Sequence, residues 1–141
     1  MIEDSIGLKG YLTISMNDKV IRQVPNVVVA LGKNYVASRM KDSSASVMSH
    51  MAIGTGSQSA VESDTTLNTE TARVALISSI VQDNKITFRA TFSAGTGTGL
   101  IKEAGLFDAS SSGRMLCRTV FQESNKQSLD SMSVVWTLQV G

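Results

Sequence analysis

Two stretches of the sequence place an apolar residue at every second position. Their apolar positions are Ile86, Phe88, Ala90 and Phe92 in the first stretch, and Met132, Val134, Trp136, Leu138 and Val140 in the second. Successive side chains of a β-strand point to opposite faces, so this period of two predicts two strands with one buried face each. A chain that contains such strands must pair them into sheets that cover a common core, and these positions are its strongest predicted core.

Shorter patterns predict the remaining elements. Gly10–Met16 and Val20–Val24 flank a polar turn and predict a hairpin, and near-helical spacing predicts one helix over Val27–Met40. The other predicted strands are Met48–Ile53, Arg73–Val81, Lys85–Phe92, Leu100–Phe107, Arg114–Phe121 and Met132–Val140, with loops at Gly95–Gly99 and Glu123–Ser128. We therefore expect a mainly β fold, an antiparallel β-sandwich or open barrel with one short helix near the N-terminal third.

A length of 141 residues fits a single domain, 1–141. Within it, residues 1–9 are expected to form an N-terminal arm. Residues 57–71 are mainly polar and predict either an ordered surface excursion anchored by Leu67 or a flexible arm. Because both segments lie outside the alternating pattern, we expect them to contact other proteins.

Charge and composition exclude several classes of function. The net charge is +1, with 13 basic and 12 acidic residues scattered along the chain, which disfavours a nucleic-acid partner. No apolar run approaches the roughly 20 residues that span a bilayer, and the acidic start is unlike a signal peptide, so we expect no membrane partner. Cys117 and His50 are each the only residue of their type, so no disulfide, metal or cofactor is expected.

Three carboxylates, Glu70, Glu103 and Asp108, are candidates for an acid/base pair such as glycoside hydrolysis uses. A simpler interpretation is structural. Glu70 stands three residues before Arg73, and Glu103 lies in an apolar strand, so ion pairs or hydrogen bonds to nearby loops account for both. We expect no enzymatic activity.

Several motifs occur together in a particular order between about His50 and Val140. They are His50–Gly56 (HMAIGTG), Asp64–Glu70 (DTTLNTE) with Arg73, Phe92–Gly95, Ile101–Asp108 (IKEAGLFD) and Gly113–Phe121. In this order and spacing they resemble small bacteriophage virion proteins of the decoration or cement type. A similar order occurs in the particle-attaching N-terminal domain of phage tail-collar fibre proteins.

The resemblance implies structural roles for the motif residues His50, Gly54, Gly56, Leu67, Glu70, Arg73, Glu103, Gly105, Phe107 and Trp136. It implies that Glu70, Arg73 and Glu103 fix the segment from Gly54 to Glu70 against a sheet. It also implies that Gly105 lets its strand bend while Phe107 fills the core.

Two functions are compatible with this resemblance. The first is a capsid decoration (cement) protein that ties neighbouring capsomers of the head lattice together, favoured by compact size, near-neutral charge and a sequence that stops after Val140 without a fibre shaft. The alternative is a tail-side fibre-attachment adaptor or collar/baseplate component; a cell-wall hydrolase is a distant third. In either main case the expected partners are other virion proteins (major capsid, tail or portal) and further copies of the chain, as a homo-oligomer such as a trimer. The expected location is the virion, after assembly in the host cytoplasm.

Overall fold

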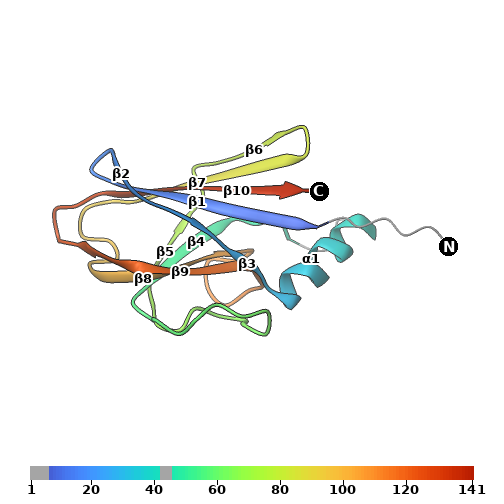
Figure 1. Cartoon of the computed structure of the whole chain (residues 1–141), viewed down its shortest axis with the longest axis horizontal. Coiled ribbons are helices and arrows are strands. Elements are labelled where there is room, and N and C mark those ends of the chain that lie inside the picture. Colours follow the sequence, from blue (N-terminus) through green and yellow to red (C-terminus); the bar gives the residue numbers. More distant parts are fainter. Residues whose placement is uncertain (1–6, 42–45) are drawn as a thin grey trace.

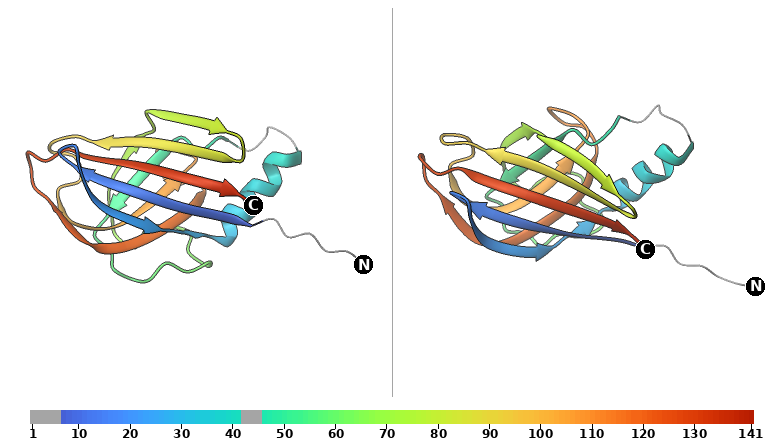
Figure 2. Two further views of the ribbon diagram at one scale, coloured as in Figure 1. Left: turned by 45° about the horizontal axis from the view of Figure 1, so that its top comes forward. Right: turned by 90° about the horizontal axis from the view of Figure 1, so that it is seen from above.

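The computed structural model describes residues 7–41 and 46–141, and in them two antiparallel β-sheets face each other (Figures 1 and 2). One five-stranded sheet, here sheet A, has the order β2-β1-β10-β7-β6, and the other, sheet B, has the order β3-β9-β8-β4-β5. The strands of sheet A are β1 (Leu8–Met16), β2 (Lys19–Pro25), β6 (Ser78–Gln82), β7 (Lys85–Phe92) and β10 (Met132–Val140). Those of sheet B are β3 (Val27–Val28), β4 (His50–Gly54), β5 (Glu70–Ala75), β8 (Gly99–Phe107) and β9 (Met115–Lys126). The predicted mainly β fold with one short helix is confirmed as an open sandwich.

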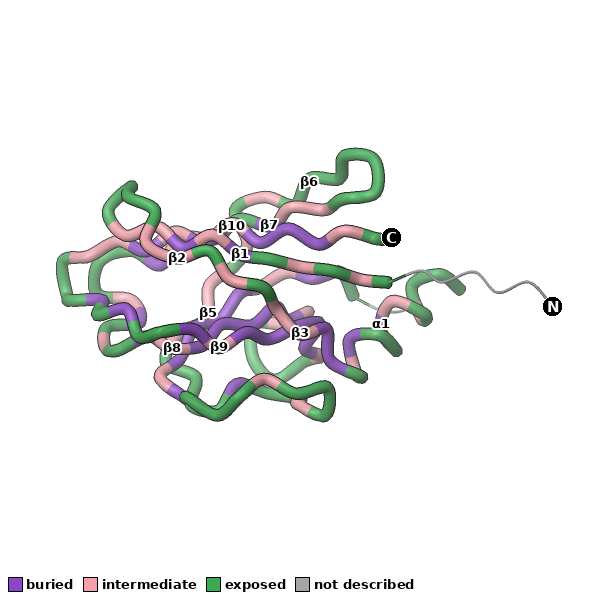
Figure 3. Tube along the Cα trace, viewed as in Figure 1, coloured by how far each residue is buried: buried purple, intermediate pink, exposed green. Residues whose placement is uncertain are grey.

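The core lies between the two sheets and contains the alternating residues. Trp136 on β10 is fully buried and stands opposite Phe88 on β7 and Leu12 on β1. Phe88, Ala90, Phe92, Met132, Val134 and Leu138 are buried with it. Of the alternating apolar positions, only two at one end of the sandwich are not buried: Ile86 is half-buried and Val140 is 46% exposed. Figure 3 shows the buried stretches running along the facing strands of the two sheets.

The predicted hairpin is confirmed as β1 and β2. Asn17 and Asp18 join the strands with positive φ angles of 51° and 68°, the conformation that a two-residue hairpin turn requires. The described residues begin at Gly7, so most of the predicted N-terminal arm, residues 1–6, lies outside them. Leu8 and Lys9 belong to β1 and pair with β10, so this part of the predicted arm is sheet.

The helix α1 (Ala30–Lys41) begins three residues later than predicted. Val27 and Val28 instead form β3, which pairs with Arg118 and Cys117 of β9, because β-branched side chains suit the edge of a sheet. Gly32 fixes the position of the helix, since a Cβ atom there would lie 2.1 Å from the Leu116 carbonyl oxygen. The helix can therefore lie directly on β9 only because this residue is glycine.

The predicted strand Arg73–Val81 is wrong, because the chain changes sheets in its middle. It forms β5 in sheet B and β6 in sheet A. The Leu76 N–H donates to Ser49 beside sheet B, whereas the Ile77 N–H donates to Arg89 of β7 in sheet A. A stretch rich in apolar residues on both sides thus contains a crossing between the two sheets that periodicity does not reveal.

The predicted loop Glu123–Ser128 is also wrong over its first four residues. β9 continues to Lys126, and Gly99 to Ile101 of β8 pair with this continuation. Its polar residues gave no strand pattern, yet Ser124 and Lys126 are buried, and the Lys126 ammonium donates to the Ser93 carbonyl oxygen at 3.0 Å. Because these side chains are polar, the sequence pattern did not predict that β9 continues to Lys126.

The first prediction concerns Cys117, which is fully buried in β9. Burial raises the pKa of its thiol well above the ordinary value, because the charged thiolate is not solvated there. Since the thiolate is the reactive form, we expect very slow labelling of the native protein by a thiol reagent and fast labelling after denaturation. Absorbance of a released chromophore measures both rates, and fast labelling of the native protein would contradict the burial of Cys117.

Candidate functional site

Sheet B has a second apolar cluster on its outer face, away from the sandwich core. Its buried members are Val29, Ala52, Leu67, Phe107 and Met115. Leu67 comes from the polar segment between β4 and β5, which lies against this face in Figure 1. Leu67 is only 6% exposed, so in the structure the excursion contacts the outer face of sheet B through this residue.

Glu103 of β8 is fully buried beneath this excursion. Its Oε2 accepts hydrogen bonds from the backbone N–H groups of Gly56 (2.8 Å) and Thr69 (2.7 Å), and its Oε1 accepts one from Asn68 (2.7 Å). Backbone N–H donors from both ends of the excursion therefore converge on one carboxylate. Bonds to a charged acceptor are stronger than neutral ones, so this carboxylate fixes both ends of the segment.

Arg118 of β9 completes the site as the counter-ion of Glu103. It is 2% exposed, and its Nε and Nη2 donate to Glu103 Oε1 at 3.2 and 2.9 Å. Its remaining bonds reach the excursion, from Nη1 to Asp64 Oδ2 and from Nη2 to the Gln58 carbonyl oxygen, both at 2.9 Å. The excursion is therefore held at its middle as well as at its ends.

Two glycines allow this close approach. A Cβ atom at Gly54 would lie 2.3 Å from the Thr69 carbonyl oxygen, and one at Gly56 would lie 2.4 Å from Glu103 Oε2. Any side chain at either position would displace the backbone or the carboxylate. Gly54 and Gly56, the two glycines of the motif His50–Gly56, thus leave the space that the hydrogen bonds of Glu103 need.

The excursion also contacts the helix and closes on itself. The Thr55 N–H donates to the Thr69 carbonyl oxygen at 3.0 Å, which brings its two ends together. The Ala30 N–H, in the first turn of α1, donates to the Glu62 carbonyl oxygen at 2.7 Å, and Lys33 forms an ion pair with the Glu62 carboxylate. The excursion is therefore a compact surface loop. Its two ends are hydrogen-bonded to each other, and Glu62 near its middle binds α1.

Glu70 and Arg73 form a second group beside the excursion. Both carboxylate oxygens of Glu70 accept from Arg73, at 3.0 and 2.7 Å, and the Arg73 guanidinium lies 3.7 Å from the centre of the Phe107 ring. Arg73 also donates to the carbonyl oxygens of Ala109 and Ser112, which holds the turn between β8 and β9. Arg73 therefore joins β5 to that turn.

Most of the predicted motif residues lie in these two groups. Gly105 belongs with them, because a Cβ atom there would lie 3.0 Å from Leu67 Cδ2 and 3.1 Å from Phe107 Cε2. Phe107 fills the outer cluster instead of the core between the sheets. Trp136 and His50 stand apart: the Trp136 Nε1–H donates to Asn26 Oδ1 at 2.8 Å, and His50 Nδ1 lies 2.7 Å from Ser49 Oγ.

Sequence reasoning missed Arg118 and the role of Asp64. Arg118 stands in the run Met115–Phe121, which is otherwise apolar except for Thr119. A charged residue within such a strand signals a buried partner. Glu103 lies in the neighbouring strand two positions from the register partner of Arg118, because Arg118 pairs with Gly105 and Glu103 pairs with Val120. Considering the two anomalies together would have identified the pair.

The three candidate carboxylates are all engaged within the protein. Glu103 is inaccessible to solvent, both oxygens of Glu70 bind Arg73, and both oxygens of Asp108 accept from Arg114, at 2.6 Å from its N–H and 3.1 Å from its Nε. This geometry argues against an acid/base pair, which needs access to a substrate. In the described ranges, 7–41 and 46–141, no three His, Cys, Asp or Glu side chains are arranged to hold a metal, and no helix is long and apolar enough to cross a membrane.

Comparison with known proteins gives one family. The model for the N-terminal region of phage tail-collar fibre proteins matches residues 22–139, a span that contains the excursion and both groups of charged residues. Neither the curated proteins nor the solved structures give a match.

The second prediction concerns Glu103→Gln. This substitution removes the charge that pairs with buried Arg118. It also replaces one acceptor oxygen with an NH2 group, a donor that would face the N–H donors of the backbone. Breaking a buried pair on one side costs about 3–5 kcal/mol, so we expect a loss of that order in the free energy of unfolding, measured by urea denaturation.

Glu62→Gln is the matched control, since it removes an ion pair that is exposed to solvent. It should leave the urea midpoint nearly unchanged because exposed pairs contribute little. Equal stability of the two variants would show that the Glu103 network does not hold the fold.

Proposed function

We propose, from the premise that this chain belongs to the family of phage tail-collar fibre N-terminal domains, that it is a tail-side attachment component. It is a structural protein of the phage virion, and as one domain it would join a fibre or collar to neighbouring tail proteins. Family membership is the observation that carries this proposal.

The ordered excursion is the surface that we propose for this attachment. Most of its side chains between Ser57 and Thr69 are exposed, although its backbone is fixed by Glu103 and Arg118. A loop held in one conformation loses less entropy on binding than a flexible one, which favours affinity. Its polar composition suits an interface that forms between proteins already folded on their own.

The family favours the tail over the capsid. Compact size and near-neutral charge suggested capsid decoration, but both are equally properties of a tail-side domain. The motifs that suggested a virion protein lie inside the matched span, 22–139. We therefore propose the tail-side role in place of the cement role, and we propose that several copies assemble as a closed homo-oligomer around the tail axis.

The third prediction is the number of copies in the particle. A closed ring or a set of fibres on a tail contains roughly 6 to 18 copies by symmetry, whereas a decoration protein covers the head in hundreds. Quantitative staining of purified virions, scaled to a tail protein of known copy number, measures this directly. A count in the hundreds would overturn the tail-side proposal.

The fourth prediction tests the excursion. Replacing residues 57–63 with a Gly/Ser linker of equal length removes their side chains, and we expect a folded protein that no longer sediments with particles lacking the wild-type chain. Leu129→Ser is the matched control, because Leu129 is 87% exposed in the turn before β10, away from this surface. Binding of the linker variant at the wild-type level would place the attachment surface elsewhere.

A further inference from the structure

The strand β6 forms an edge of sheet A and is rich in exposed apolar residues. Among the described residues only β7 pairs with it, and Figure 1 shows β6 at the top of the molecule with no other element beyond it. Ile77, just before the strand, is 67% exposed, and Ile80 and Val81 within it are 57% and 69% exposed. Exposed apolar residues are ordinary when they are scattered, but these three fall within five positions of one edge.

This edge also lacks the features that prevent strands from pairing between molecules. Proteins protect free edges with charged side chains, proline or very short strands. Residues 74–82 contain no charged residue and no proline. The other three edges of the described sheets are protected: β2 contains Arg22 and Pro25, β5 contains the Glu70–Arg73 ion pair, and β3 has only two residues. In the part of the chain that the structure describes, β6 is the edge without such protection.

The edge is apolar on both faces of the sheet. Directly opposite residues of an antiparallel pair point to the same face. Val81 pairs with Ile86, which packs against the core, so Val81 lies on the inner face. Ile80 pairs with Thr87, whose Oγ1 lies 3.3 Å from Thr137 Oγ1 on the outer face. A strand added beside β6 would therefore meet an apolar side chain on each face.

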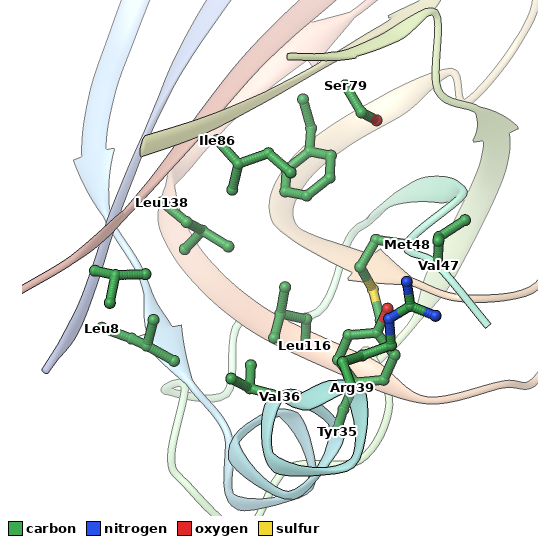
Figure 4. Close-up of a pocket in the computed structure, with 12 residues that line it drawn as sticks. Leu8, Tyr35, Val36, Arg39, Val47, Met48, Ser79, Ile86, Leu116 and Leu138 are labelled. Carbon is green, nitrogen blue, oxygen red and sulfur yellow. The ribbon is translucent and has the colours of Figure 1, made fainter. Parts of the chain in front are cut away.

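The inner face of β6 borders a hollow. An apolar pocket of about 460 Å³ lies between α1 and the ends of the strands (Figure 4). Ser79 of β6 and Ile86 of β7 line it from sheet A, and Val36 of α1 and Leu116 of β9 line it from the other side. Val81 therefore stays exposed although it faces inward. A strand beside β6 would supply apolar contacts that the described part of the domain does not.

The chemistry of the edge selects its partner. The backbone N–H and C=O groups of a free edge are matched by another extended strand. Like charges directly opposite each other destabilise a strand pair, and an uncharged strand can pair with an identical one without this cost. A second copy of β6 is therefore a suitable partner. Since each copy has one β6, this pairing uses both free edges and ends at two copies.

Symmetry brings the exposed side chains of the two copies together. In an antiparallel pair about a twofold axis perpendicular to the sheet, each face of one strand continues into the same face of the other. Opposite residues must then share a face, so the axis passes through a residue, such as Ser79, Ile80 or Val81. In each of these three registers the two Ile80 side chains are directly opposite or diagonal neighbours, which is within contact distance for long side chains.

We propose that β6 of one copy pairs with β6 of a second copy, antiparallel and about a twofold axis, so that the two A sheets form one continuous sheet. The inference deepens the proposed function, on which it rests for the role of the pair in the virion, by naming one contact of the homo-oligomer. A twofold pair is itself closed, and larger closed assemblies are built from such pairs.

The mass of the purified protein in solution, measured by light scattering during gel filtration, tests the proposal. We expect twice the mass of one chain, falling toward that of one chain on dilution. Ile80→Lys brings two like charges together, so we expect the dissociation constant of the dimer to rise about tenfold or more. Val20→Lys is the matched control, because Val20 is 56% exposed in the edge strand β2 and Ile80 is 57% exposed in β6. It should leave the dissociation constant unchanged.

A charge exchange tests whether Ile80 faces its own counterpart. Ile80→Glu should weaken the dimer as Ile80→Lys does, and an equal mixture of the two variants should associate again because opposite charges then meet. A wild-type mass of one chain at every concentration would overturn the proposal. A dimer that Ile80→Lys does not weaken, or a mixture that does not associate, would also overturn it.

Failure of this inference can be distinguished from failure of the proposed function. If the mass measurement shows no β6 pairing while the copy number is that of a tail protein, this inference alone falls. If the dimer forms and responds to Ile80→Lys as expected while hundreds of copies are counted in each particle, the tail-side role falls.

Discussion

Glu103 and Arg118 are both charged and both removed from water, and the position of the whole excursion depends on their contact. Burying two charges costs several kcal/mol for each ion, and their attraction offsets this only when the remaining hydrogen-bonding groups are satisfied. Here the backbone of the excursion supplies those bonds, through Gly56, Asn68 and Thr69 to the carboxylate. The ion pair and the excursion therefore depend on each other. The carboxylate needs the backbone hydrogen bonds, and the backbone N–H groups need the carboxylate as their acceptor.

This mutual dependence explains why sheet B is buried on both faces. Alternation predicts one buried and one solvated face, yet Ala52 and Phe107 are buried on the outer side while Met51 and Leu106 are buried in the core. The excursion covers the outer side only because its polar backbone has partners there. A loop without the carboxylate would leave N–H groups buried and unsatisfied, at a cost of about 1–3 kcal/mol each. The polar network thus allows a polar segment to serve as the third layer of the fold.

The sequence was informative where one physical rule decides the structure and less so where two compete. Strict alternation located β7 and β10 and most of their buried residues, and the Asn17-Asp18 turn located the first hairpin. Periodicity could not show that the chain changes sheets between Leu76 and Ile77, because both halves are equally apolar. The motif residues around Glu103 were recognised by their order, but Arg118 was missed because its partner lies in another strand, fifteen residues away.

The pocket follows from the position of α1. Gly32 lets the helix lie on β9, but the helix then closes the end of the sandwich only in part, with Tyr35 as its one large buried side chain. An unfilled apolar hollow forgoes the contacts that a filled one would gain, and protein interiors are otherwise packed as densely as organic crystals. A larger residue than Val36 on the helix would fill this space and stabilise an isolated copy.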